Sequence, residues 1–247
     1  MSTNKILIML IVLFSLTLPL YAAEPIKFAY YDNYAPRSFV KDGKLQGILI
    51  DVVNEALVNR MGIEVKHEGF PWARAQALVE KGSSDAFITV PTTKRKTYTK
   101  VSKEPVLLFQ TYLATASDNP KLSVLKTITS LDQLKNYVFV DYYGNGFSKK
   151  LLKDMTVNWL PDYKAIYRFL VQKKADVMIV SRKGIYSIEE LGFKNQITVL
   201  PYPMTSVAFH LCINNNSKYV NILDKFDMVI KQMHDDGTID KIIRNYY

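Results

Sequence analysis

The chain has 247 residues, of which 48% are apolar, and a formal net charge of +9. This apolar content is enough for one large or two small cores, and the single cysteine, Cys212, excludes an intramolecular disulfide. The positive charge favours anionic partners, which include nucleic acid, membrane surfaces and small anions.

The first 22 residues are predicted to be a cleavable secretory signal peptide. A short head with one lysine precedes the apolar run Ile6–Phe14, and small residues follow at Ala22 and Ala23. The alternative, a membrane-spanning helix, needs about 20 apolar residues, whereas this segment is interrupted by Ser15, Thr17 and Pro19. We therefore expect a soluble periplasmic protein that begins at Ala23 or Glu24. Export disfavours nucleic acid as the partner.

The mature chain begins with alternating strand and helix patterns. Strands are expected at Ile26–Tyr31, Ile63–Phe70 and Asp85–Val90, and helices at Gly47–Met61 and Trp72–Lys81. The alternation indicates an α/β unit with a largely parallel sheet.

A second unit of the same kind follows Leu131. Strands are expected at Tyr137–Tyr143, Val157–Leu160 and Asp176–Val180, and a helix at Phe147–Met155. Another helix carries Ala165, Ile166, Phe169 and Leu170 on one face. The C-terminus is predicted to be helical, with an apolar stripe formed by Ile222, Leu223, Phe226, Val229, Ile230 and Met233.

Two extended segments, Pro105–Ala116 and Thr198–Ile213, connect the units. If the chain leaves the first unit through one and returns through the other, they form a hinge, and small ligands commonly bind between such lobes. We expect lobe 1 to comprise residues 23–110 and 207–247, and lobe 2 residues 111–206.

The mature chain resembles the family 3 extracellular solute-binding proteins, the periplasmic receptors of polar amino-acid ABC transporters. No single motif is decisive, but the order and spacing of several are specific. They are YAPRSF (34–39), DGKLQGILIDVVNEA (42–56), Trp72 with GSSDA (82–86), TTKR (92–95), SLDQLKN (130–136), KKADVMIVS (173–181) and DDGTIDKIIRNYY (235–247). The resemblance implies a two-lobed periplasmic-binding-protein α/β fold, with a mixed sheet flanked by helices in each lobe and two hinge strands.

The resemblance also implies a set of substrate-binding residues. Thr92 and Arg95 match the pair that clamps the substrate carboxylate, a task suited to the paired donors of a guanidinium. Tyr34 and Trp72 match aromatic residues on two sides of the ligand. Gly144 and Asn145 fall where a helix N-terminus faces the ligand anion in the family. Four further cations of the same charge run are expected to face solvent: Lys94, Lys96, Lys100 and Lys103.

Two positions depart from the family pattern. Ser181 stands where an aspartate usually pairs with the substrate ammonium, and a hydroxyl cannot neutralise a desolvated cation. Arg37 stands where the family commonly has an aromatic residue. These changes favour an anionic or less cationic solute, or an amino acid held by another acid.

The expected function is therefore capture of a small polar, carboxylate-bearing solute by lobe closure and its delivery to the membrane permease of an ABC transporter. We expect a monomer with no cofactor, no metal and no catalytic residue. Two alternatives remain open: an exported dehydratase-like enzyme acting on a small carboxylic acid, and a binding subunit that serves a sensor kinase or chemoreceptor.

Overall fold

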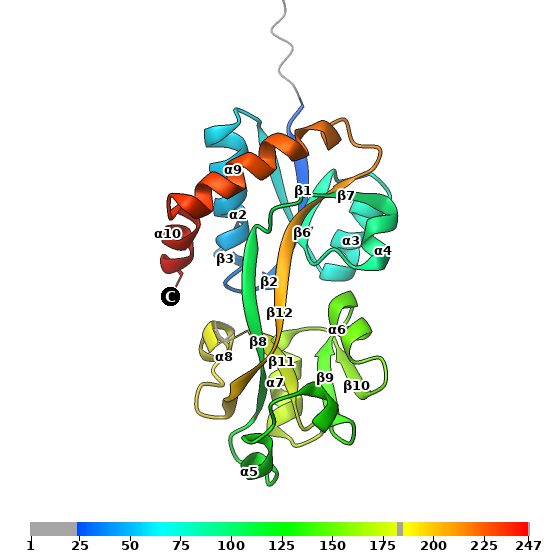
Figure 1. Cartoon of the computed structure of the whole chain (residues 1–247). Helices are drawn as coiled ribbons and strands as arrows, with labels where there is room; N and C mark the ends of the chain where they lie inside the picture. The colour runs from blue at the N-terminus through cyan, green and yellow to red at the C-terminus, as the bar shows by residue number, and fades with distance from the viewer. Residues whose placement is uncertain (1–23, 182–184, 247) are drawn as a thin grey trace, which may run out of the picture.

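The structure is a computed structural model that describes residues 24–181 and 185–246. The predicted signal peptide lies outside the described residues. Figure 1 shows two lobes, with the long strands β8 (Leu107–Ala116) and β12 (Ile197–Asn214) running from one to the other. Within the described ranges, no helix combines the length and the apolar character that a membrane crossing requires.

One seven-stranded mixed sheet extends through both lobes. Its strand order is β11-β8-β12-β6-β1-β5, and β7 pairs with the end of β12. β1 is parallel to β5 and β6, whereas β12 is antiparallel to β6, β7 and β8. The remaining bounds are β1 Ile26–Tyr31, β5 Val65–Phe70, β6 Ala86–Thr89, β7 Thr99–Val101 and β11 Met178–Ser181.

The pairing of β8 with β12 is irregular near its middle. The register shifts on both sides of Pro203, which faces Tyr112, before regular pairing resumes from Thr205 opposite Thr111. Proline has no N–H to donate to a neighbouring strand, which accounts for the local loss of ladder hydrogen bonds. The pairing of the two crossing strands is therefore least regular where they pass between the lobes.

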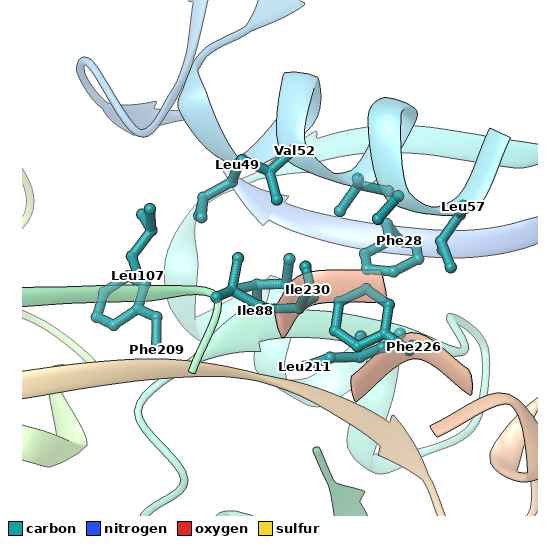
Figure 2. Close-up of a cluster of buried hydrophobic side chains, with 14 of the residues drawn as sticks. Phe28, Leu49, Val52, Leu57, Ile88, Leu107, Phe209, Leu211, Phe226 and Ile230 are labelled. Carbon is teal, nitrogen blue, oxygen red and sulfur yellow. The ribbon is translucent and has the colours of Figure 1, made fainter. Parts of the chain in front are cut away.

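The largest core lies in lobe 1 and includes the C-terminal helices. Phe226, Val229, Ile230 and Met233 are buried on α9 at the spacing of one helical face and pack with Phe28 of β1 (Figure 2). Burial of each such side chain contributes about 1.5–3 kcal/mol. The helices of this lobe are α2 Ile48–Val53, α3 Trp72–Glu80, α4 Thr93–Tyr98, α9 Leu223–Asp235 and α10 Thr238–Arg244, with a 3₁₀ turn at Val220–Ile222.

Lobe 2 has two smaller cores on the two sides of its strands. The short parallel pair of β9 (Val138–Tyr142) and β10 (Thr156–Leu160) contacts β11 through an isolated bridge between Phe139 and Val177. Helix α7 (Tyr163–Val171) buries Ile166, Tyr167 and Leu170 against these strands. The other helices are α5 Leu122–Leu125, a 3₁₀ turn at Leu131–Leu134, α6 Gly146–Leu151 and α8 Ile185–Glu190.

Some elements differ from the sequence-based expectation. The helix expected over Gly47–Met61 changes at Asn54 into a π-helix that ends at Arg60. The spacing of apolar residues over two turns is too short a signal to distinguish a π-helix from an α-helix. Helix α6 ends at Leu151 instead of Met155, because Leu152 leaves helical dihedral angles and is buried in a lobe 2 core. A small antiparallel sheet was not predicted; its strands are β2 Asn33–Tyr34, β3 Ser38–Lys41 and β4 Lys44–Gln46.

Candidate functional site

A cavity lies between the lobes beside the crossing strands. The centre of a water-sized sphere can occupy about 60 Å³ of it. Lobe 1 contributes residues from the β2–β3 turn, from the start of α3 and from α4, and lobe 2 contributes residues from β11 and from the starts of α6 and α7. Among the predicted site residues, the structure brings six to the cavity wall: Tyr34, Arg37, Trp72, Arg95, Asn145 and Ser181.

Arg95 is buried in the cavity wall and is held by three hydrogen bonds. Its Nε and Nη2 donate to Gln76 Oε1 at 3.1 and 2.9 Å, and its Nη1 donates to the carbonyl oxygen of Val90 at 2.8 Å. The guanidinium carbon lies 5.1 Å from the centre of the Trp72 ring, within cation–π range. Burial lowers the pKa of Arg95 from its ordinary value. A guanidinium has five N–H donors, and those that neither these contacts nor the Tyr98 side chain occupies remain for a ligand.

Arg37 is equally buried but has a different environment. Its side chain is 5% exposed, and its guanidinium carbon lies 4.3 Å from the ring centre of Phe109, 4.8 Å from that of Tyr34 and 5.9 Å from that of Phe209. We call these three rings the aromatic cage. Within the described ranges, the Arg37 guanidinium has no hydrogen bond and no ion pair. Its positive charge is therefore buried without an anionic partner.

Ser181 ends β11 and brings a hydroxyl to the cavity wall from lobe 2. The residue is 8% exposed, and its Oγ is the one buried side-chain polar atom of the described residues that lacks a hydrogen-bond partner. A buried hydroxyl without a partner costs free energy, which a polar ligand group in the cavity would recover.

Asn145 reaches the cavity, but its polar atoms are largely occupied. Its Nδ2 donates to both carboxylate oxygens of Asp141 and to Ser148 Oγ, and its Oδ1 accepts from the backbone N–H of Ser148. Asp141 is buried behind it, and burial raises the pKa of this carboxyl to about 6. Asn145 therefore caps α6 and holds Asp141.

The two lobes contact each other around the cavity. The rings of Tyr34 and Tyr163 stack across it with centres 6.0 Å apart, and the ring centres of Tyr31 and Tyr142 lie 5.4 Å apart. Gln76, which holds Arg95, also donates from Nε2 to the carbonyl oxygen of Gly144 at 3.1 Å. Lobe 2 thus contacts Gln76, the residue that positions Arg95.

Two predicted site residues lie outside the cavity wall. Thr92 is the N-cap of α4, and its Oγ1 accepts the backbone N–H of Arg95 at 3.4 Å, so it supports the helix that carries the guanidinium. Gly144 has φ +84°, and a Cβ there would lie 3.2 Å from Gln76 Nε2 and 3.3 Å from Trp72 Cδ1. Glycine at this position allows lobe 2 to approach α3. A direct ligand contact by either residue stays a prediction.

The charge run around Arg95 divides as expected. Arg95 is buried, and its neighbours in the run are exposed: Lys94, Lys96, Lys100 and Lys103. Of the described residues, no group of three or more His, Cys, Asp or Glu side chains is arranged to hold a metal ion.

Several residues in the cavity wall or directly behind it were missed in the sequence. Phe109 and Phe209 face each other from β8 and β12, with ring centres 5.3 Å apart. Both residues lie in the two segments predicted to cross between the lobes, and this position could have indicated that they are close to the cavity. Gln76, Tyr142 and Tyr163 carried no such signal, because their roles depend on contacts between lobes.

Comparisons with known proteins agree with this geometry. A family profile described as "Bacterial extracellular solute-binding proteins, family 3" matches residues 26–247. A protein of Vibrio harveyi named "Putative amino-acid ABC transporter-binding protein PatH" is 23% identical over 228 residues, which are 90% of this chain and 88% of that protein.

Two solved structures illustrate the range of proteins with this fold. A histidine kinase sensor domain with similarity to periplasmic binding proteins superposes with a TM-score of 0.75 at 16% identity, over 90% of this chain and 96% of that one. The ancestral amino acid-binding protein AncCDT-1, a precursor of cyclohexadienyl dehydratase, superposes with a TM-score of 0.69 at 20% identity, over 90% and 95% of the chains. At these identities the structures share the fold, and the site must indicate the function.

Proposed function

Because the chain belongs to the bacterial extracellular solute-binding proteins of family 3, we propose that it captures a small carboxylate-bearing solute by lobe closure and delivers it to an ABC-transporter permease. The observation that carries this proposal is Arg95. A buried guanidinium, fixed by Gln76 and the Val90 carbonyl, lines a cavity between two lobes. Its charge and its remaining N–H groups suit a carboxylate, which forms strong charge-assisted hydrogen bonds with a guanidinium.

Lobe closure is supported by the contacts that cross the cavity. Gln76 joins Arg95 to the Gly144 carbonyl of lobe 2, and Tyr34 stacks on Tyr163. A solute bound to Arg95 would lie between surfaces that meet only when the lobes are closed, so its binding energy favours the closed state. A permease that recognises both lobes would distinguish this state from an open one.

Binding without chemistry fits the cavity better than the enzyme alternative. General acid–base catalysis usually needs a histidine or an acid within reach of the substrate. Among the cavity-wall residues that the structure describes, none is Asp, Glu, His or Lys. A receptor that serves a sensor would use the same cavity, and it differs from a transport receptor only in the partner that recognises the closed lobes.

The proposal is tested by a thermal-shift screen of the mature protein with amino acids, carboxylates and other small anions, followed by calorimetry on the hits. Replacement of Arg95 by Lys keeps the charge but removes the planar fork, so affinity for a carboxylate ligand should fall at least about tenfold, or roughly 1.4 kcal/mol. Lys96→Ala, at an exposed neighbour, is the matched control and should change little. Equal losses in the two variants would indicate a diffuse basic surface, and no hit at all would exclude a receptor for small polar solutes.

A further inference from the structure

The cavity wall has two positive charges and no negative one within the described ranges. Arg37 and Arg95 both line it, at 5% and 3% exposure, while every other described wall residue is uncharged at neutral pH. Two buried guanidinium groups beside one cavity attract anions strongly, because bulk water screens their charge poorly there.

Arg37 needs a partner more than Arg95 does. The contacts of Arg95 with Gln76, Val90 and the Tyr98 side chain satisfy most of its five donors. The aromatic cage supplies Arg37 with cation–π attraction, worth about 0.5–2 kcal/mol, but no hydrogen-bond acceptor. A buried charge is normally paired or hydrogen-bonded. The cage therefore holds the guanidinium in a position where an anion from the cavity can reach its N–H groups.

A ligand ammonium group would find no carboxylate on this wall. The nearby buried acid, Asp141, is directed to Asn145 Nδ2 and to the backbone N–H of Tyr142 at 2.7 Å, and it does not line the cavity. Ser181 offers only a neutral hydroxyl. The charged groups on the described part of the wall thus match acidic groups on the ligand and leave a desolvated ammonium without a charged partner.

We propose that the cavity binds a short solute with two carboxylate groups and no ammonium group, one carboxylate on Arg95 and the other on Arg37. This inference rests on the proposed function, since it concerns the ligand of the same site. The Ser181 hydroxyl donates to one of the carboxylates. The rings of the aromatic cage contact the carbon chain between them.

The size of the cavity limits the length of that chain. A buried water needs about 10–15 Å³ of space measured in the same way, so about 60 Å³ corresponds to roughly four to six waters. Succinate and glutarate, with four and five carbons, are therefore the appropriate probes.

The experiment is calorimetric titration of the mature protein with matched sets of probes. Succinate is compared with butyrate, which lacks the second carboxylate, and with L-aspartate, which adds an ammonium group; glutarate is compared with valerate and L-glutamate. The better dicarboxylate should bind at least about tenfold more tightly than its monocarboxylate and its amino-acid counterpart. These comparisons use the unmodified protein.

Variants locate the second anion site. Arg37→Gln should weaken dicarboxylate binding at least about tenfold and bring it to the level of the monocarboxylate. The matched control is Arg74→Gln, because Arg74 also stacks on a ring, that of Phe70 at 5.2 Å, but is exposed and outside the cavity wall. Arg37→Lys retains the charge and should keep a preference for two carboxylates even if Arg37→Gln does not fold.

Each alternative outcome is decisive. If aspartate or glutamate binds more tightly than succinate or glutarate, the proposal that the ligand has no ammonium group is wrong. If the monocarboxylates bind as tightly as the dicarboxylates, the proposal of a second anion site at Arg37 is wrong. If other solutes from the wider screen bind and these six probes do not, the inference fails while the proposed function stands. If no small polar solute binds, both fail.

Discussion

Arg95 and Arg37 occupy two parts of the same cavity wall, and they differ in how their charge is accommodated. Arg95 stacks on Trp72 and donates three hydrogen bonds to protein acceptors. Arg37 lies in the aromatic cage, and no acceptor among the described residues reaches its guanidinium. Nearly equal burial therefore conceals a difference: protein acceptors satisfy Arg95 in the folded structure, whereas Arg37 is left with N–H groups that, in our proposal, a ligand satisfies.

The largest expected effect tests this difference in the unliganded protein. Arg95→Met removes the hydrogen bonds of a charged group to Gln76 Oε1 and to the Val90 carbonyl, each of which contributes about 1.5–3 kcal/mol; Gln76 Oε1 loses its donors, while the Val90 carbonyl keeps the backbone N–H of Thr92. We expect a loss of about 4 kcal/mol in the free energy of unfolding, measured by urea denaturation. Arg37→Met leaves no acceptor unpaired and keeps an unbranched stem in the aromatic cage, so its change should stay below about 1 kcal/mol. Similar losses in both variants would contradict the comparison.

A third buried charge, Asp141 in lobe 2, extends the comparison through pH. Burial raises the pKa of this carboxyl from 3.8 to about 6, so between these values the folded state binds its proton more tightly than the unfolded state. Ionisation at neutral pH therefore costs stability, and this cost disappears as the pH falls to about 4. Each pKa unit corresponds to about 1.4 kcal/mol.

We therefore compare the wild type with Asp141→Asn by urea denaturation at pH 4, 5 and 7. The wild type should gain up to about 3 kcal/mol relative to the variant between pH 7 and pH 4. Titration of other carboxyl groups is common to both proteins and cancels in this difference. Parallel pH profiles would mean that Asp141 is not held ionised in a dry environment.

The smallest effect concerns Ser181, whose hydroxyl, like the guanidinium of Arg37, has no hydrogen-bond partner among the described residues but carries no charge. Ser181→Ala removes a buried hydroxyl that has no partner, so the unliganded protein should gain about 1 kcal/mol. For a domain of this size, that corresponds to an increase of about 2–4 °C in Tm. Ligand affinity should fall less than tenfold. A lower Tm would show that the hydroxyl already has a partner in the folded protein.

Much of the fold was predictable because its signals are local. The apolar stripe of α9 and the strand–helix alternation from Ile26 to Val90 express burial on one face of each element, and burial of this kind leaves a period in the sequence. The small sheet from Asn33 to Gln46 was missed because its strands contain at most four residues, too few to show a period.

The site was predictable only where a residue type carries chemistry alone or matches a family motif. Arg95 and Ser181 reach the cavity wall, as their motif positions suggested. Gln76 could not be assigned to the site from the sequence. A glutamine on a helix carries no local pattern that would predict its hydrogen bonds with Arg95 and with Gly144 of the other lobe. The ring contact between Phe109 and Phe209 likewise depends on the register of β8 with β12, in which Phe109 pairs with Val207 and Phe209 with Leu107.

The position of β12 has a consequence for the order of folding. This strand lies between β8 and β6, so without it the sheet separates into a β11–β8 pair and a β6–β1–β5 group with open edges. Residues 197–214 follow every other strand of this sheet along the chain, and the α9 residues that complete the lobe 1 core come later still. Pairings between distant segments form slowly, because the intervening loop must first be closed. We therefore expect the sheet to be completed only after the segment from Ile197 has been made, which would leave the preceding strands unpaired at one edge until then.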